Sequence, residues 1–288
     1  MTPKPTLPLV LSPGACIGIV GGGQLGRMLA LAAAELGFQT HIFCPEENSP
    51  ASQVATFSTQ ANYDDKSALD GFANSVDVVT YEFENIPVPT VAHIGTTKPV
   101  LPSAKALEVA QDRWVEKTFM RDLGLGVADF HDITSVQDLR AALDATQGEG
   151  ILKTRRFGYD GKGQWRLRAD TDLDAIMAEL DGQPAILEAL VPFEREISLL
   201  VARNPVGDTA TYDALENVHK NHILHTSTLP ATLTQPQAKA AQAMAAKIAN
   251  ALDYVGVLAI ECFVTPQGLL VNEIAPRVHN SGHLTQDA

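Results

Sequence analysis

The chain has 288 residues, of which 45% are hydrophobic and 19% are charged, so it can bury cores for two or three domains. Its 34 acidic and 21 basic residues give a net charge of -13, which would repel a polyanion and argues against a nucleic-acid partner. Three widely spaced cysteines, no signal-like start and no apolar run of membrane-spanning length lead us to expect a cytoplasmic protein without membrane contact.

Residues 16–101 alternate short apolar segments with helical ones. The predicted strands are CIGIV, THIFC and VDVVTY, and the predicted helices cover residues 24–36 and 66–72. This alternation is typical of a parallel, doubly wound α/β domain.

A glycine motif separates the first strand from the first helix. Gly21, Gly23 and Gly26 form G-x-G-x-x-G, and Glu46 follows the next strand. The pattern fits a dinucleotide site, but it fits equally a tight turn or another anion at the helix N-terminus. An NAD-dependent oxidoreductase or a non-enzymatic nucleotide-binding module therefore stays open at this point.

A second glycine-rich stretch, RFGYDGKG, lies between the strand-like segments ILKT and QWRLR and predicts a hairpin with a mobile loop. Lys153 lies in the first of these strands, where a buried ammonium needs an anionic partner such as a phosphate. Gly158, Gly161 and Gly163 would let the loop fold over a polyphosphate with its backbone amides. The alternative for the other cations of this hairpin is that they are solvated charges; these are Arg155, Arg156, Lys162, Arg166 and Arg168.

The segments VGVLAIECFV and LLVNEIAP form the most apolar strand pair of the chain. A three-residue hairpin loop at residues 266–268 would place Glu261 opposite Glu273 on one face, with their Cβ atoms about 4.5–5.5 Å apart. A two-residue loop would pair Glu261 with Asn272 instead. Two opposed carboxylates on an apolar hairpin need a proton or a cation between them. We predict Mg²⁺ there, shared with substrate phosphates and assisted by Asn272; two solvated acids are the alternative.

Several blocks of sequence are more specific than any of these patterns. They are GGGQLGRM, YEFENIP, KTRRFGYDGKGQWRLR, LEALVPFEREIS, AIECFV and LLVNEIAPRVHNSGH. Together they strongly resemble ATP-grasp enzymes, and specifically the 5-(carboxyamino)imidazole ribonucleotide synthetase family, from about Cys16 to the end of the chain. In that family the first glycine motif belongs to a substrate-binding domain and not to a dinucleotide site.

The resemblance implies an α/β fold with α+β character in its later domains. It implies a Rossmann-like, substrate-binding pre-ATP-grasp domain at residues 1–111, an ATP-grasp lid domain at 112–187, and a C-terminal ATP-grasp domain at 188–288 that is expected to be incomplete. The implied activity is carboxylation of the exocyclic amine of 5-aminoimidazole ribonucleotide in purine biosynthesis, using ATP, bicarbonate and Mg²⁺ in a homodimer. Another ATP-grasp carboxylate–amine ligase is the alternative within this superfamily.

The resemblance also implies site residues. For the nucleotide these are Arg113, Lys153, Gly158, Tyr159, Asp160, Gly161, Lys162, Gly163, Gln164, Glu188, Ala189, Leu190, Val191, Glu196, His219, Asn272 and Glu273. For the ribonucleotide and bicarbonate they are Gly23, Gln24, Leu25, Glu82, Asn85, Arg277, His279, Asn280 and Ser281. His222 stands where the family usually has glycine, which leaves the role of His219 open.

The final block crowds five polar side chains into seven residues after a buried strand. A purely structural loop rarely needs both an arginine and a histidine, so we predict Arg277 and His279 as a catalytic pair, with Asp160 facing them from the glycine-rich loop. Arg277 would hold bicarbonate, and the other two would orient the amine or handle its proton. Asp160 could instead serve only as a turn residue before glycine, and Glu84 in YEFENIP could be a solvated acid.

Overall fold

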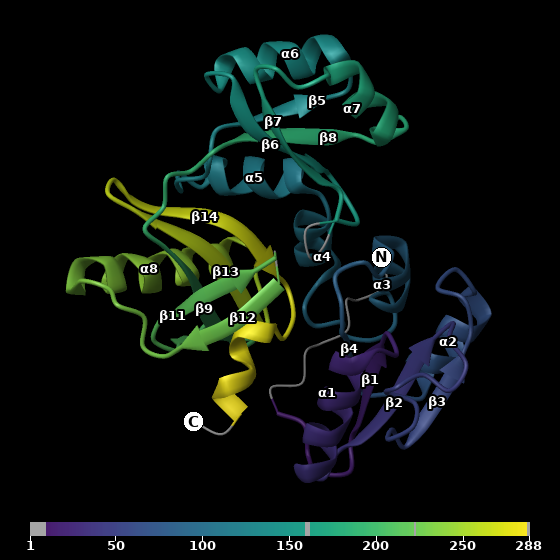
Figure 1. Ribbon diagram of the computed structural model, residues 1–288. Coiled ribbons are helices and arrows are strands. Elements are labelled where there is room, and N and C mark those ends of the chain that lie inside the picture. The colour runs from purple at the N-terminus through teal and green to yellow at the C-terminus, as the bar shows by residue number, and fades with distance from the viewer. Residues whose placement is uncertain (1–9, 159–161, 222, 287–288) are drawn as a thin grey trace.

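The computed structural model describes residues 10–158, 162–221 and 223–286, which form three β-sheets with helices packed against them (Figure 1). In Figure 1 the first sheet lies at the lower right, the second at the top and the third at the left. Among the helices of these ranges, none combines the length and apolar character that crossing a membrane requires.

The first sheet has strand order β3-β2-β1-β4, and every neighbouring pair is parallel, as the alternating sequence predicts. Its strands are β1 (Cys16–Val20), β2 (Gln39–Cys44), β3 (Phe57–Gln60) and β4 (Val78–Tyr81), and its helices are α1 (Gln24–Glu35), α2 (Lys66–Asn74) and α3 (Val88–Ile94). Phe43, Phe72 and Tyr81 are buried in its core, so both strands and helices contribute to it. Helix α4 (Ala104–Gln111) leads out of this unit.

The second sheet is antiparallel, in the order β5-β8-β6-β7. It consists of β5 (Phe130–Ile133), β6 (Glu149–Thr154), β7 (Gln164–Arg168) and β8 (Ala185–Ala189), with α6 (Val136–Ala145) and α7 (Leu173–Leu180) packed on it. Lys153 pairs with Gln164, which confirms the hairpin predicted around the glycine-rich loop.

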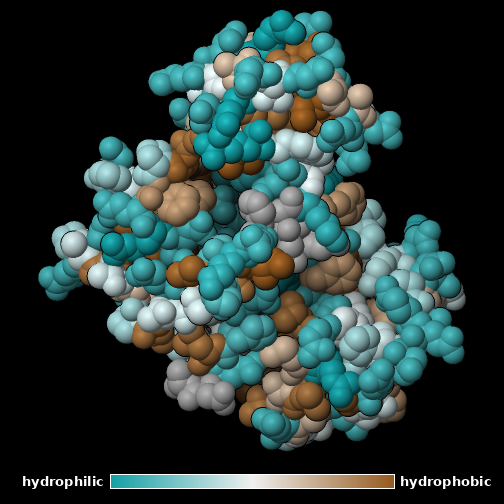
Figure 2. Space-filling view, in the orientation of Figure 1, coloured by the Kyte–Doolittle hydropathy of each residue, from teal (hydrophilic) through white to brown (hydrophobic). Residues whose placement is uncertain are grey.

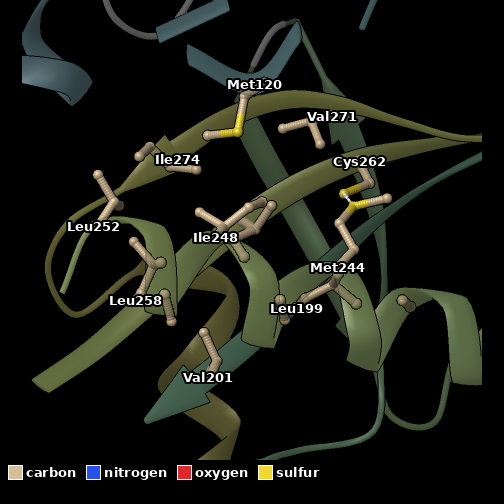
Figure 3. Packing of buried hydrophobic residues seen from close by; sticks show 14 of the residues in the cluster. Met120, Leu199, Val201, Met244, Ile248, Leu252, Leu258, Cys262, Val271 and Ile274 are labelled. Atoms are coloured by element: carbon tan, nitrogen blue, oxygen red, sulfur yellow. Dashed lines mark hydrogen bonds between the residues drawn. The ribbon is translucent and has the colours of Figure 1, made fainter. Parts of the chain in front are cut away.

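The third sheet has the order β12-β11-β9-β13-β14, with β10 on β9. Its elements are β9 (Arg195–Arg203), β10 (Thr209–Thr211), β11 (Leu215–Lys220), β12 (Ile223–Thr228), α8 (Gln235–Ala251), β13 (Gly256–Thr265), β14 (Gly268–Ala275) and the 3₁₀ helix η1 (Asn280–Gln286). Ile248 of α8, Leu258 of β13 and Met120 of α5 (Arg113–Asp122) belong to one cluster of buried hydrophobic residues, drawn in Figure 3. Helix α5 is therefore held against the third sheet. The division into domains at residues 111 and 187 stays a prediction.

The turn between β13 and β14 differs from the prediction. Thr265 pairs with Gly268, so the loop contains only Pro266 and Gln267, and the predicted three-residue loop is wrong. Glu261 nevertheless pairs with Glu273. The register shifts by one residue at a β-bulge on β14, which restores the pairing that a regular two-residue hairpin would have lost.

Candidate active site

A cleft of about 390 Å³ is lined by residues from all three sheet units. The predicted site residues in its wall are Asn85, Arg113, Lys153, Gly158, Lys162, Gln164, Glu196, His219, Glu261, Asn272, Glu273, Arg277, His279 and Asn280. Hydrophilic side chains cover most of the face shown in Figure 2. The structure thus brings together segments that are distant in the sequence. Tyr159, Asp160, Gly161 and His222 lie outside the described residues.

The remaining predicted residues lie outside this wall. Glu188 and Ala189 end β8, Leu190 and Val191 follow it, and Gly163 precedes β7. Gly23, Gln24, Leu25 and Glu82 lie at the turn between β1 and α1 or next to it, and Ser281 is buried in η1. The structure therefore groups most of the residues predicted for the nucleotide in one cleft, whereas the predicted substrate residues of the first glycine motif lie outside that wall.

The first glycine motif packs around a carboxylate. Glu82 is 5% exposed and accepts hydrogen bonds from the backbone amides of Gly23 and Gly26, the latter at 2.6 Å. A Cβ atom at Gly23 would lie 2.7 Å from Glu82 Oε1, and one at Gly21 would overlap the same side chain. The N-terminus of α1 thus already holds an anion of the protein itself. A dinucleotide pyrophosphate would have to bind the same backbone amides that already donate to Glu82, and its negative charge would be repelled by that carboxylate. The glycine motif therefore no longer supports an oxidoreductase.

Lys153 has an anionic partner within the protein. Its Nζ lies 3.0 Å from Glu188 Oε2, and Lys117 Nζ lies 3.1 Å from the same oxygen. Burial lowers the pKa of Lys153. Burial alone would raise the pKa of Glu188, but the two ammonium groups outweigh it and hold this pKa at about 2. Lys117 was not predicted, although its position four residues after Arg113 places both on one face of α5.

The opposed carboxylates of β13 and β14 differ in their surroundings. Burial and the neighbouring Glu273 both raise the pKa of Glu261. Burial acts on Glu273 in the same direction, but Arg113, whose Nη1 lies 2.8 Å from Glu273 Oε2, overrides it and lowers that pKa. The buried Oδ1 of Asn272 has no hydrogen-bond partner within the described ranges.

These three side chains fit a magnesium ion. Two carboxylates and an unsatisfied amide oxygen are the hard oxygen donors that Mg²⁺ prefers, and the remaining positions would be filled by phosphate and water. The part of the chain that the structure describes has no cluster of three or more His, Cys, Asp or Glu residues that could hold a metal without such help. The site therefore suits a metal that arrives with a nucleotide.

Arg277 forms an ion pair with Glu84 of the first sheet unit. Its Nη2 donates to Glu84 Oε1 at 2.9 Å, its Nε donates to Glu84 Oε2, and its Nη1 donates to the carbonyl of Val278 at 2.9 Å. Burial would raise the pKa of Glu84, but the hydrogen bond and charge of Arg277 lower it. Glu84 is thus an ion-pair partner of the predicted bicarbonate residue and not a solvated loop acid.

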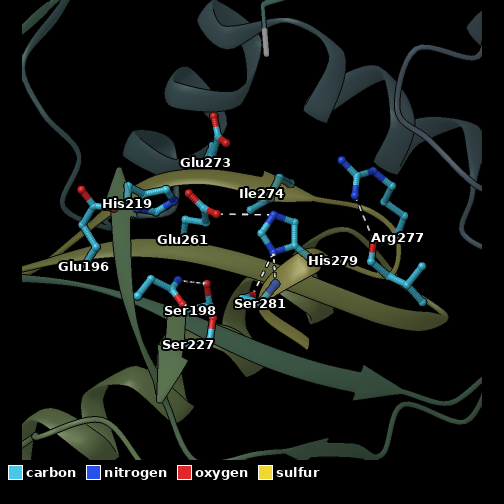
Figure 4. A network of polar contacts seen from close by, with 12 residues as sticks. Glu196, Ser198, His219, Ser227, Glu261, Glu273, Ile274, Arg277, His279 and Ser281 are labelled. Atoms are coloured by element: carbon cyan, nitrogen blue, oxygen red, sulfur yellow. Dashed lines mark hydrogen bonds and ion pairs between the residues drawn. The ribbon is translucent and has the colours of Figure 1, made fainter. Parts of the chain in front are cut away.

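His279 lies between Ser281 and Glu261 (Figure 4). Its Nδ1 accepts a hydrogen bond from the backbone amide of Ser281 at 3.3 Å and lies 2.9 Å from the Ser281 hydroxyl. Burial, and then the charge of Arg277, lowers the pKa of His279 to about 4. The ring is therefore neutral at pH 7, and we assign its proton to Nε2, which lies 3.4 Å from Glu261 Oε1.

The opposite wall of the cleft contains Glu196 and His219. His219 Nδ1 lies 2.6 Å from Glu196 Oε2, and the register of β11 shifts between Val218 and His219. Two residues predicted for the nucleotide are thus in contact with each other. What His219 does for a ligand stays a prediction.

Comparisons with known proteins identify the family. Residues 118–288 match the ATP-grasp domain, and residues 15–111 match the ribonucleotide synthetase preATP-grasp domain. Over 281 residues the chain is 51% identical to N5-carboxyaminoimidazole ribonucleotide synthase of Brucella melitensis, covering 96% of this chain and 78% of that protein. The chain belongs to the N5-carboxyaminoimidazole ribonucleotide synthase family.

Other members of the N5-carboxyaminoimidazole ribonucleotide synthase family agree with this assignment. The protein of this name from Pseudomonas aeruginosa is 45% identical, with 93% of this chain and 74% of that protein covered. A solved structure of an ADP complex of a synthetase of this family has a TM-score of 0.92 at 42% identity, covering 97% of this chain and 74% of that one. The Aspergillus clavatus enzyme, solved with ADP and 5-aminoimidazole ribonucleotide, has a TM-score of 0.86 at 26% identity, covering 95% and 72%. The predicted ATP-grasp fold and ligase class are confirmed.

Proposed function

We propose that the cleft carries out the reaction of its family, the ATP-dependent carboxylation of the exocyclic amine of 5-aminoimidazole ribonucleotide. One observation carries this proposal. The side chains predicted for the nucleotide, Arg113 and Lys153, line the same cleft as those predicted for bicarbonate and the amine, Arg277 and His279, with the carboxylates of β13 and β14 between the two groups. Relatives solved with ADP, and with ADP plus this ribonucleotide, support it.

The chemistry needs two bond exchanges. A bicarbonate oxygen attacks the γ-phosphorus of ATP, ADP leaves, and carboxyphosphate forms. The amine nitrogen then takes the carboxyl carbon, directly or as carbon dioxide, while phosphate leaves and the amine loses a proton. Lys153 and Arg113 supply positive charge where the phosphoryl group would transfer. Closure of the glycine-rich loop over the cleft would protect carboxyphosphate from water.

The polar contacts suggest separate roles on the substrate side. Two hydrogen bonds to Glu84 fix the orientation of the Arg277 guanidinium. Arg277 is therefore suited to bind planar bicarbonate through its remaining N–H donors. His279 is neutral with its Nε2 protonated, so this geometry favours a role as a hydrogen-bond donor that orients the substrate over a role as a base that removes its proton.

Magnesium would be held by Glu261, Glu273 and Asn272, and when bound it would neutralise charge on the ATP phosphates. The proposal also includes the other assigned nucleotide and substrate residues, the domain divisions after residues 111 and 187, a homodimer and a cytoplasmic location. The family matches at residues 15–111 and 118–288 support the first division. The three free, buried cysteines fit a reducing compartment.

An assay of ADP release tests the proposed reaction. We expect turnover with ATP, magnesium, bicarbonate and 5-aminoimidazole ribonucleotide together, and a fall to the enzyme-free background when either bicarbonate or the ribonucleotide is omitted. Other carboxylate and amine pairs serve as controls. Unchanged turnover after rigorous removal of bicarbonate and carbon dioxide would show that the assigned reaction is wrong.

A further inference from the structure

Two ammonium groups share one buried carboxylate beneath the nucleotide side of the cleft. Glu188 of β8 has a side chain that is 4% exposed, and its Oε2 contacts both Lys153 of β6 and Lys117 of α5. Lys153 is 12% exposed and lines the cleft, whereas Lys117 is 1% exposed and does not. Glu188 therefore lies between one lysine on the cleft side and one on the interior side.

This arrangement holds one more positive charge than the carboxylate neutralises. An isolated buried ammonium is costly, and the Lys153–Glu188 pair would already be neutral without Lys117. Beyond its ion pair, Lys117 Nζ makes no hydrogen bond within the described ranges, so no other contact there explains it. Lys117 gains a role if Lys153 leaves Glu188 during part of the reaction, because Glu188 then still has a cationic partner.

We propose that Lys117 is a positioning residue, which keeps Glu188 fixed as an anion while Lys153 engages the phosphates of the nucleotide. This inference rests on the proposed function, because it requires a nucleotide beside Lys153. When phosphate oxygens attract Lys153, Glu188 keeps Lys117 as its partner and needs no proton. The Oε1 atom of Glu188 is buried and has no partner within the described ranges, so Oε2 carries the printed contacts of this carboxylate.

Other titratable groups face this pair of lysines. Arg113 of α5 acts on both Glu188 and Lys153, Glu273 of β14 acts on Lys153, and Glu116 of α5 is affected by Lys117. Arg113 is itself paired with Glu273. Lys117 is therefore the cation that stays in contact with Glu188 when Lys153 turns to phosphate.

The test uses Lys117→Met, which keeps most of the buried volume and removes the charge. We expect the variant to fold with a thermal midpoint close to that of wild type, because Lys153 and Glu188 remain a neutral pair. We expect it to bind ADP about tenfold or more weakly at pH 7, the size of a lost charge-assisted contact. Calorimetry in buffers of different ionisation heat should show uptake of about one proton on binding, since Glu188 loses its remaining cation.

The proton uptake separates positioning from a structural role. Because binding to the variant consumes a proton, its deficit in ADP affinity relative to wild type should grow from pH 6 to pH 8. Lys247→Met, on the exposed face of α8, is the matched control and should bind as wild type does. Loss of the fold in Lys117→Met, unchanged ADP affinity, or weaker binding without proton uptake would each overturn the inference. Failure of wild type to bind ADP would instead overturn the proposed function.

Discussion

Glu116 is the most deeply buried acid beside the cleft. It is 2% exposed, and its Oε1 accepts a hydrogen bond from the backbone amide of Ile274 at 2.6 Å. Burial, reinforced by the charge of Glu273, raises its pKa from an ordinary value of 4.5 to about 8. Glu116 is therefore largely protonated near neutral pH in the folded protein.

This shift predicts the pH dependence of a Glu116→Gln variant. Between pH 4.5 and about 8 the unfolded chain releases the Glu116 proton and the folded chain keeps it, so wild type loses stability as pH rises through this range. The loss is a few kcal/mol in all, at ~1.4 kcal/mol per pKa unit. Glutamine keeps the acceptor oxygen and cannot ionise. We expect its thermal midpoint, without metal or ligand, to exceed that of wild type at pH 8 but not at pH 4.5.

Glu108→Gln, on the exposed side of α4, is the control and should follow wild type at every pH. Parallel curves for Glu116→Gln and wild type would show that Glu116 is ionised at neutral pH in the fold.

For single residues, the sequence predicts what kind of partner a side chain needs, but not which residue provides it. The sequence predicted that Lys153 needs an anion, but not that Glu188 provides one. Strands β6 and β8 are distant in the sequence and become neighbours only in the folded sheet. Glu84 and Lys117 were missed as functional partners for the same reason. Only the four-residue spacing of Arg113 and Lys117, which places both on one face of α5, could have indicated that Lys117 lies near the predicted nucleotide site.

At the element scale, the β13–β14 hairpin places the two predicted metal ligands. The loop length was wrong and the pairing of Glu261 with Glu273 was right, because a bulge at Asn272 compensates for the shorter loop. A bulge breaks the alternation on which register predictions rest, so the sequence pattern alone does not reveal it. Strands β1, β2 and β4 of the first sheet and the β6–β7 hairpin follow regular patterns and were predicted, whereas β3 was not.

The hairpin geometry predicts the effect of Glu273→Gln on magnesium. The neutral amide is a weaker ligand than the carboxylate and no longer pairs with Arg113, so we expect the magnesium concentration for half-maximal ADP formation to rise about tenfold. The same assay on Glu108→Gln controls for the loss of an acidic side chain. A Glu273→Gln variant with unaltered magnesium dependence would rule out the metal site.

At the scale of the whole molecule, the three sheet units are connected across the cleft by polar side chains. Gln111 donates to the carbonyls of Glu84 and Ile86 in the first unit and accepts from Arg156, next to the glycine-rich loop. The Glu84–Arg277 ion pair joins the first unit to the end of β14. The family and the reaction were predictable from sequence blocks, whereas these connections depend on how the units pack.

In the proposed reaction, ATP activates bicarbonate as carboxyphosphate in this cleft. The most direct measurement is isotope transfer from ¹⁸O-labelled bicarbonate, with ATP, magnesium and 5-aminoimidazole ribonucleotide, followed by mass analysis of the released phosphate. The bicarbonate oxygen that attacks the γ-phosphorus stays on phosphorus when the carboxyl group leaves. We therefore expect one ¹⁸O atom in each phosphate formed by turnover. Phosphate that carries oxygen from water and none from bicarbonate would contradict it.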